Sequence, residues 1–200
     1  MPALRRVCLY AGSSPGADPA YADAAEEVSR ALVTRGIGVV YGGASVGLMA
    51  VLADAAMGAG GEVIGVLPRA LGSREIGHRG LTRLEVVETM HERKARMAEL
   101  SDAFIALPGG VGTLEEVVEA LTWTMLGIHL KPVALLNVHG YYDALEGFLD
   151  GSREQGFLKA EHRALLLSDG DAATLVERLT QWEPVHASRW TPAETPPAAR

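Results

Sequence analysis

The chain has 200 residues, 48% of them hydrophobic and 22% charged, and a formal net charge of −7. This balance is typical of one soluble globular domain with a substantial core, and the negative charge argues against a protein that coats nucleic acid. The single cysteine, Cys8, excludes an intramolecular disulfide. The lack of a signal peptide, and of an apolar run of about 18 residues, predicts a cytoplasmic protein that does not span a membrane.

Strand-like and helix-like segments alternate along the chain, which predicts an α/β fold: a Rossmann-like, doubly wound parallel sheet with helices on both faces. In chain order, the predicted strands cover residues 6–11, 37–41, 62–67, 84–87, 103–107 and 132–137. The predicted helices cover residues 19–35, 48–57, 89–100, 113–127, 141–153 and 172–182. Asp18-Pro19 introduces the first helix as an N-cap followed by proline at the first helical position. Thr89 and Glu92 have the spacing of a capping box at the start of the third helix.

Two segments fall outside this alternation. Residues 69–83 contain three glycines and no clear periodicity, which predicts a mobile loop of the kind that often covers a site in such folds. From Pro184 onward the chain has four prolines and no periodicity, so we expect residues 184–200 to be a disordered tail. Residues 1–183 then make a single Rossmann-like domain.

Glycines follow three of the predicted strands directly, at Gly12, Gly42-Gly43 and Gly109-Gly110. The carboxyl ends of parallel strands meet at one edge of the sheet, which is where open α/β sheets bind ligands. A tight turn explains any one of these glycines. Their occurrence after three strands favours a ligand crevice at this edge.

The segment from Pro108 to Glu116 has three glycines in four positions between a predicted strand and a predicted helix. Unshielded backbone amides at a helix N-terminus, together with the helix dipole, form a ready site for a phosphate. The dipole also favours Glu115 and Glu116 if they lie in the first turn. Alternatively, Thr113 and Glu116 have the spacing of a capping box, which would make them devices that start the helix.

A second polar segment, residues 90–96, places three cations within four positions near the start of a predicted helix. Positive charge is unfavourable there unless a negative group lies nearby. Either Arg93 and Lys94 face a phosphate and a carboxylate, or this is a solvated face on which Glu92 pairs with Arg96.

The remaining polar residues give weaker signals. Ser13 and Ser14 follow the first glycine turn and are candidates to donate hydrogen bonds to a ligand or to cap a turn. Glu75 lies in the irregular loop, where a lone carboxylate supports no role by itself. The histidines do not have metal-site spacing within one helix, so we expect no bound metal.

Residues 108–116 match the Pro-Gly-Gly-x-Gly-Thr-x-x-Glu signature of the LOG ("Lonely guy") family, the cytokinin riboside 5′-monophosphate phosphoribohydrolases. Residues 90–94, Met-His-Glu-Arg-Lys, resemble the second motif of that family, and residues 41–49 resemble its glycine-rich second turn. The resemblance covers residues 5–182. This sequence departs from the family pattern at Ala44 and Ala50, where glycine is usual, and these departures bear on fine specificity.

The resemblance implies a Rossmann-like homodimer, without cofactor, that cleaves the N-glycosidic bond of N6-modified adenosine 5′-monophosphates to free base and ribose 5-phosphate. AMP itself is the alternative substrate. By the motif match, Arg93 and Glu116 are the catalytic pair. A carboxylate at Glu116 suits the oxocarbenium-like transition state of glycosidic cleavage. With the glycine turns included, the expected substrate contacts are Ser13, Gly43, Glu75, Arg93, Lys94, Gly109, Gly110, Val111, Gly112, Thr113, Leu114, Glu115, Glu116 and Thr122.

Two other functions would need different residues from this hydrolase. A non-catalytic nucleotide or cofactor carrier on the same fold would need the phosphate cradle but not the pair Arg93 and Glu116. A pyridoxal-dependent lysine decarboxylase would need a Schiff-base lysine, and the sequence has only Lys94, Lys131 and Lys159, none in a pyridoxal-site pattern.

The homodimer has independent support in the sequence. The predicted helices 89–100 and 113–127 carry more apolar surface than a modest sheet covers, so we expect a two-fold dimer to bury part of it beside the site. The apolar residues concerned are Met90, Met97, Leu114, Val117, Val118, Leu121, Trp123, Met125 and Leu126.

Overall fold

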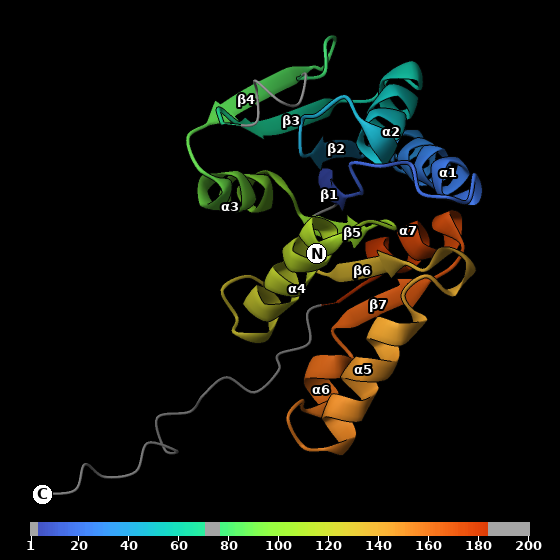
Figure 1. The fold of residues 1–200 in the computed structure, drawn as a ribbon, viewed down its shortest axis with the longest axis vertical. Coiled ribbons are helices and arrows are strands. Elements are labelled where there is room, and N and C mark those ends of the chain that lie inside the picture. The colour runs from blue at the N-terminus through green and yellow to red at the C-terminus, as the bar shows by residue number, and fades with distance from the viewer. Residues whose placement is uncertain (1–3, 71–76, 184–200) are drawn as a thin grey trace, which may run out of the picture.

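The computed structural model describes residues 4–70 and 77–183. Within them, seven parallel strands form one sheet in the order β4-β3-β2-β1-β5-β6-β7 (Figure 1). This order confirms the predicted Rossmann-like α/β fold. The strands are β1 Arg6–Tyr10, β2 Gly38–Tyr41, β3 Val63–Pro68, β4 Arg83–Val87, β5 Ala103–Ala106, β6 Val133–Leu136 and β7 Leu166–Asp169.

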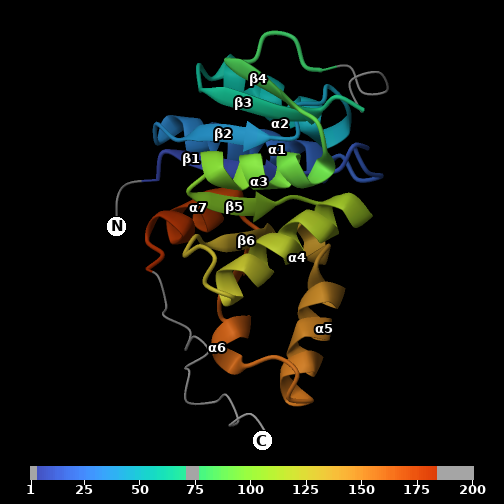
Figure 2. The same ribbon diagram turned by 90° about the vertical axis from the view of Figure 1, so that its left-hand side faces the viewer.

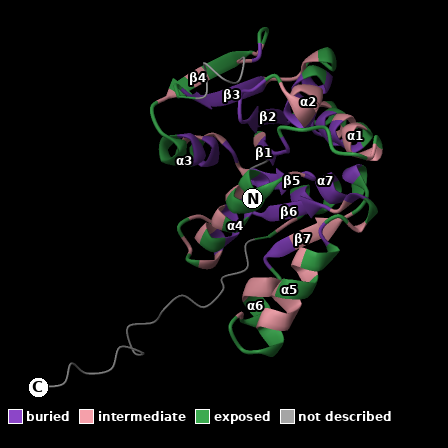
Figure 3. Cartoon of the chain, viewed as in Figure 1, coloured by how far each residue is buried: buried purple, intermediate pink, exposed green. Residues whose placement is uncertain are grey.

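Helices cover both faces of the sheet, as the alternation predicted. Helices α1 (Ala20–Thr34), α2 (Gly47–Gly58) and α7 (Ala172–Thr180) pack on one face. Helices α3 (Met90–Leu100) and α4 (Val111–Met125) pack on the other, where Figure 2 shows them in front of the strands. Strands covered on both faces are expected to be apolar, and β2, β3, β5 and β6 are buried along their whole length, as Figure 3 shows.

Side chains of β1 show how the sheet separates its two cores. Val7 and Leu9 belong to the core under α1, α2 and α7, whereas Cys8 and Tyr10 belong to the core under α3 and α4. This alternation follows from the two-residue period of a strand.

Two helix starts follow the sequence signals. Pro19 has helical dihedral angles, and the Asp18 carboxylate accepts a hydrogen bond of 2.9 Å from the Ala20 amide. The Thr89 hydroxyl accepts a hydrogen bond of 3.1 Å from the Glu92 amide at the start of α3.

The start of α4 differs from the prediction. The helix begins at Val111 rather than Thr113, with Gly110 as an N-cap that has no side-chain hydrogen bond. The capping-box interpretation of Thr113 and Glu116 is therefore wrong, and Glu116 lies beyond the first turn, as does Glu115. Gly109 permits this earlier start, because a Cβ atom at that position would lie 2.2 Å from the Thr113 Oγ1 atom.

Sequence reasoning missed β7, the short helix α6 (Ala160–Arg163) and a 3₁₀ turn, η1, at Val138–Gly140. The strand β7 is four residues long and half polar, Leu-Leu-Ser-Asp, so it has little of the apolar signal that marks a strand. It lies at the edge of the sheet and pairs with β6 alone.

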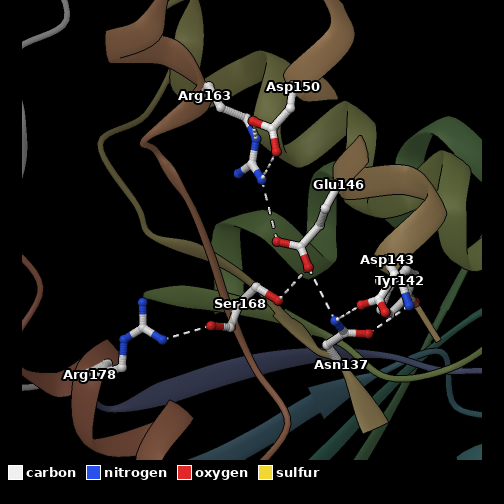
Figure 4. A network of polar contacts seen from close by, with 8 residues as sticks. All are labelled: Asn137, Tyr142, Asp143, Glu146, Asp150, Arg163, Ser168 and Arg178. Carbon is white, nitrogen blue, oxygen red and sulfur yellow. Dashed lines mark hydrogen bonds and ion pairs between the residues drawn. The ribbon is translucent and has the colours of Figure 1, made fainter. Parts of the chain in front are cut away.

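A polar network fastens this edge to α5 (Asp143–Glu154), as Figure 4 shows. The Glu146 carboxylate accepts hydrogen bonds from the Asn137 amide (3.1 Å) and the Ser168 hydroxyl (3.0 Å). Arg163 of α6 reaches the same carboxylate at 3.4 Å. These contacts join β7 and α6 to α5, so the polar residues of this network have a structural role.

The predicted loop 69–83 is described only in part. Residues 71–76, including Glu75, and the predicted tail 184–200 lie outside the described residues. Past the gap, Gly77 forms an isolated antiparallel bridge with Ala44. Searched over the described residues, the helices include none long and apolar enough to cross a membrane.

Candidate active site

The candidate site lies where the chain changes faces of the sheet. After β1 the chain continues to α1 on one face, and after the neighbouring β5 it continues to α4 on the other. The two turns touch, because the Gly12 amide donates a 3.2 Å hydrogen bond to the Pro108 carbonyl. A side chain on Gly12 would place its Cβ 3.2 Å from the Gly109 Cα atom, so glycine permits this close approach. Open α/β sheets bind ligands at such a switch point.

A cavity of about 330 Å³ opens at this point. Eight of the predicted site residues line it: Ser13, Arg93, Gly110, Val111, Gly112, Thr113, Glu115 and Glu116. Gly109 lines an adjoining cavity of about 240 Å³ that also shares Ser13 and Gly110. Four predicted contacts line neither of these two cavities, namely Gly43, Lys94, Leu114 and Thr122, and Glu75 lies outside the described residues.

The N-terminus of α4 forms one wall of the larger cavity. The first helical hydrogen bond here runs from the Leu114 amide to the Gly110 carbonyl, so the preceding amides of residues 111–113 have no partner within the helix. Added Cβ atoms on Gly110 and Gly112 would meet nothing within 4 Å. Packing therefore does not require these two glycines, and their effect is to leave the amides open to an anion.

Gly109 has a different role from its neighbours. Its Cβ would lie 2.2 Å from the Thr113 Oγ1 atom and 2.9 Å from the Gly12 amide nitrogen. The hydroxyl of Tyr141 also donates a 2.5 Å hydrogen bond to the Gly109 carbonyl. Gly109 thus fixes the shape of the turn, whereas Gly110 and Gly112 keep its amides accessible.

Arg93 extends from α3 into the buried side of the cavity. Its Nε atom donates to the Val66 carbonyl (3.1 Å) and its Nη2 atom donates to the Gly42 carbonyl (3.2 Å). A Cβ on Gly42 would lie 1.9 Å from Nη2, so the guanidinium occupies the space that this glycine leaves. Two backbone carbonyls therefore fix the orientation of a side chain that is 9% exposed.

The remaining nitrogen of Arg93, Nη1, lies 3.8 Å from Glu116 Oε1. The Glu116 side chain is 11% exposed, and its burial raises the pKa of the carboxyl to about 7, an effect that the positive charge of Arg93 partly opposes. A carboxyl with a pKa near 7 exchanges protons readily at neutral pH, as general acids and bases in enzymes do.

Lys94 was expected to contact the substrate, but it does not line the cavity. Its ammonium contacts the Glu115 carboxylate and lies 3.1 Å from the Glu119 carboxylate, both on α4. Burial would lower the pKa of Lys94, but the hydrogen bonds to these carboxylates outweigh it and the pKa is raised. Lys94 therefore ties α3 to α4 beside the cavity.

The alternative interpretation of residues 90–96, in which Glu92 pairs with Arg96, is wrong. Arg96 instead binds Glu85 of β4 (2.6 Å) and Glu99 of its own helix (3.0 Å). Each of the three cations near the start of α3 thus faces a carboxylate. These carboxylates supply the negative charge that the helix dipole demands near an N-terminus.

Thr122 lies on the exposed side of α4, where its hydroxyl donates to the Val118 carbonyl at 2.7 Å. Of the apolar residues expected at a dimer surface, Met97, Val117 and Leu121 are buried in the core. The exposed ones are Met90, Leu114, Val118 and Leu126, joined by Val111 and Ile128.

Sequence reasoning missed the apolar wall of the cavity, formed by Leu9, Met49, Met90 and Met97. From the sequence, Leu9 and Met49 were expected inside a strand and a helix, and Met90 and Met97 were expected at a dimer surface. Only the fold shows that these side chains meet around one space. Among the described residues, no group of three or more His, Cys, Asp or Glu side chains is arranged to hold a metal ion.

The sequence is similar to one protein family and to several named proteins. A family profile described as "Possible lysine decarboxylase" matches residues 49–179. The chain is 48% identical over 183 residues to the cytokinin riboside 5′-monophosphate phosphoribohydrolase LOG1 of Arabidopsis thaliana, covering 92% of this chain and 86% of that protein. It is 48% identical over 181 residues to LOG, the enzyme of the same description from Oryza sativa subsp. japonica, covering 90% and 75%.

Solved structures show the same fold at lower identity. The molybdenum cofactor carrier protein of Chlamydomonas reinhardtii aligns with a TM-score of 0.67 and 22% identity, covering 88% of this chain and 96% of that one. The protein TM1055 aligns with a TM-score of 0.70 and 24% identity, covering 89% and 99%. At this identity the likeness concerns the fold alone. The identity of about half over nine-tenths of the chain is decisive, and the chain belongs to the LOG family of cytokinin riboside 5′-monophosphate phosphoribohydrolases.

Proposed function

We propose that this protein hydrolyses the N-glycosidic bond of N6-modified adenosine 5′-monophosphates, releasing the free base and ribose 5-phosphate. The observation that carries the proposal is the buried pair of Arg93 and Glu116, 3.8 Å apart, in a cavity whose wall is the open N-terminus of a helix. The names of the relatives at 48% identity support it independently.

The helix N-terminus suits the 5′-phosphate. Open amides at residues 111–113 attract an anion, and a long helix places its dipole behind them. Glu116 lies five residues after Val111, which corresponds to a rise of about 7.5 Å along the helix. A phosphate held at the amides would thus extend its ribose along α4 toward the Glu116 carboxylate.

The chemistry required is the attack of water on C1′ with departure of the base. The bond from C1′ to the base nitrogen breaks, water supplies the oxygen of the new hydroxyl, and the proton of that water ultimately replaces C1′ on the base. The ribose carries positive charge in the transition state, as in glycoside hydrolysis. An ionised Glu116 stabilises that charge and accepts a proton from water; its pKa near 7 suits both tasks.

Arg93 supports this reaction through position and charge. A guanidinium stays protonated at every accessible pH, so it is unsuited to donate a proton to the base. Its two backbone hydrogen bonds hold it beside Glu116, where it favours the ionised carboxylate. The apolar wall containing Met49 and Met90 offers a surface for the planar base.

The other two functions fit the site less well. A carrier needs the open amides but gains nothing from burying a carboxylate beside an arginine. For a pyridoxal enzyme, none of the three lysines is suitably placed. Lys94 is held by two carboxylates, Lys131 donates to the Ala98 carbonyl at 2.6 Å, and Lys159 is exposed outside the cavity.

We also propose a homodimer as the working form in the cytoplasm. The exposed apolar side chains of α4 support a second copy of this chain as the partner. Thr122 lies along the same exposed side of α4 as Val118. A partner packed there brings Thr122 close to a second subunit, which would reconcile its implied role in substrate binding with its distance from the cavity of its own subunit.

The test is a comparison of substrates. The protein is incubated with isopentenyladenosine 5′-monophosphate, with AMP and with the two corresponding nucleosides, and the released base is quantified by chromatography. We expect base and ribose 5-phosphate in equal amounts from the monophosphates, with the modified one preferred. Tight binding of the monophosphates without release of any base would favour the carrier.

A further inference from the structure

The conformation of the turn after β2, residues 42–44, depends on contacts with other parts of the protein. It begins with two glycines, and Gly43 has φ of +78°, in the left-handed region. Glycine has the greatest conformational freedom of any residue, so contacts from elsewhere must fix such a turn. On one side Arg93 Nη2 donates to the Gly42 carbonyl, and on the other the His78 amide donates to the Gly43 carbonyl at 3.0 Å.

The side chain of His78 extends this second attachment to α2. The imidazole is 8% exposed, and its Nε2 atom lies 3.1 Å from Asp54 Oδ1. Because an ionised carboxylate only accepts hydrogen bonds, we assign the donor hydrogen to Nε2. The other ring nitrogen, Nδ1, is buried without a hydrogen-bond partner among the described residues. Asp54 is thus the polar anchor that orients this imidazole.

We propose that His78 and Asp54 are positioning residues of the hydrolytic site, which act by fixing the turn 42–44 against which Arg93 is held. The proposal rests on the function proposed above. The Val66 carbonyl, the other support of Arg93, belongs to β3, and β3 is paired on both sides within the sheet. The Gly42 carbonyl is therefore the support that depends on contacts from outside the sheet.

Displacement of Gly42 would be transmitted directly to the catalytic pair. The guanidinium packs so closely on Gly42 that no Cβ fits between them, and its Nη1 atom faces Glu116. Neither His78 nor Asp54 lines the cavity, and the open amides of α4 lie on a different element. Loss of the contact should therefore lower kcat and leave phosphate binding, and with it KM, nearly unchanged.

The experiment compares four variants with the wild-type protein. Asp54→Ala removes the anchor. The Asp54 side chain is 68% exposed, so we expect this variant to fold. Asp54→Asn retains an oxygen acceptor at the same place and is the conservative rescue. His78→Leu removes the contact from the other end, and Glu27→Ala removes an exposed helical carboxylate on α1 as the matched control.

Two readouts are taken on each variant: kcat and KM for AMP or its N6-modified form, and hydrogen exchange of the Arg93 Nε–H group by NMR. We expect Asp54→Ala and His78→Leu to lower kcat about 10-fold, as small misplacements of catalytic groups do. Exchange at Arg93 should become faster in both. Asp54→Asn should retain most of the activity, and Glu27→Ala all of it.

Unchanged kcat and unchanged exchange at Arg93 in Asp54→Ala would overturn the proposal. So would a loss confined to KM, or an Asp54→Asn variant as impaired as Asp54→Ala. The exchange measurement does not depend on hydrolysis. If the wild-type protein released no base at all, the proposed function would fail, while exchange at Arg93 would still decide whether Asp54 and His78 hold it in place.

Discussion

Replacing Glu116 with glutamine gives a direct test of the buried carboxyl, because glutamine preserves the shape of the side chain and cannot ionise. In the folded protein the pKa of Glu116 is raised from 4.5 to about 7, mainly by burial. Between these two pH values the folded state binds more protons at this position than the unfolded state. The free energy of unfolding therefore falls as the pH rises from 4.5 to 7, because the carboxyl ionises in the unfolded state and stays protonated in the folded state.

The size of this effect follows from the pKa difference. At about 1.4 kcal/mol per pH unit, the rise to about 7 corresponds to roughly 3 kcal/mol of folding free energy lost by the wild-type protein across that range. The Glu116→Gln variant does not lose this folding free energy, because glutamine does not ionise. Leaving Arg93 without its counter-charge also changes stability, but by an amount that does not vary with pH, since arginine stays charged throughout.

The assay is urea unfolding of both proteins at pH 5 and pH 8. We expect the variant to gain about 2–3 kcal/mol relative to the wild-type protein between these two pH values. A difference between the two proteins that stays constant with pH would refute the reasoning, because it would mean that Glu116 has an ordinary pKa in the folded state.

Three further outcomes are expected. Adenosine should be cleaved at least about 100-fold more slowly than AMP, measured as kcat/KM, because the nucleoside lacks the phosphate that positions the bond; equal rates would contradict a phosphate site at α4. Gly109→Ala should lower the unfolding free energy by about 1–3 kcal/mol, because its Cβ would lie 2.2 Å from Thr113 Oγ1. Gly112→Ala, at an open helical position, should not lower it. Equal stabilities of the two variants in urea would contradict this packing. Light scattering should show a dimer for the wild-type protein and a monomer for Val118→Asp, while a wild-type monomer at micromolar concentration would exclude the proposed assembly.

Much of the fold was predictable because its signals are local. Apolar runs, glycine turns and the caps at Asp18 and Thr89 each identify an element from a few neighbouring residues. The strand β7 carries only two apolar residues and acquires its place by pairing with β6, so its signal is not local. The early start of α4 also depends on tertiary contacts, because Thr113 is buried under the turn and cannot cap it.

The candidate site was predictable as a set of residues but not as a set of contacts. The family resemblance paired Arg93 with Glu116, although they lie 23 positions apart in the sequence. It gave no means of telling that Lys94 would be held by Glu115 and Glu119, since that choice depends on how α3 packs against α4. The contact between His78 and Asp54 could not be predicted either, because nothing in the sequence shows that the two side chains meet.

The central claim is that Glu116 takes part in chemistry on a nucleotide held elsewhere in the site. It is tested most directly by measuring, on the same folded Glu116→Gln variant, both the affinity for AMP and the rate of base release. The account predicts that AMP still binds, because the amides at the start of α4 are untouched, and that base release falls by about 100-fold or more. A folded variant that releases base at nearly the wild-type rate would contradict it.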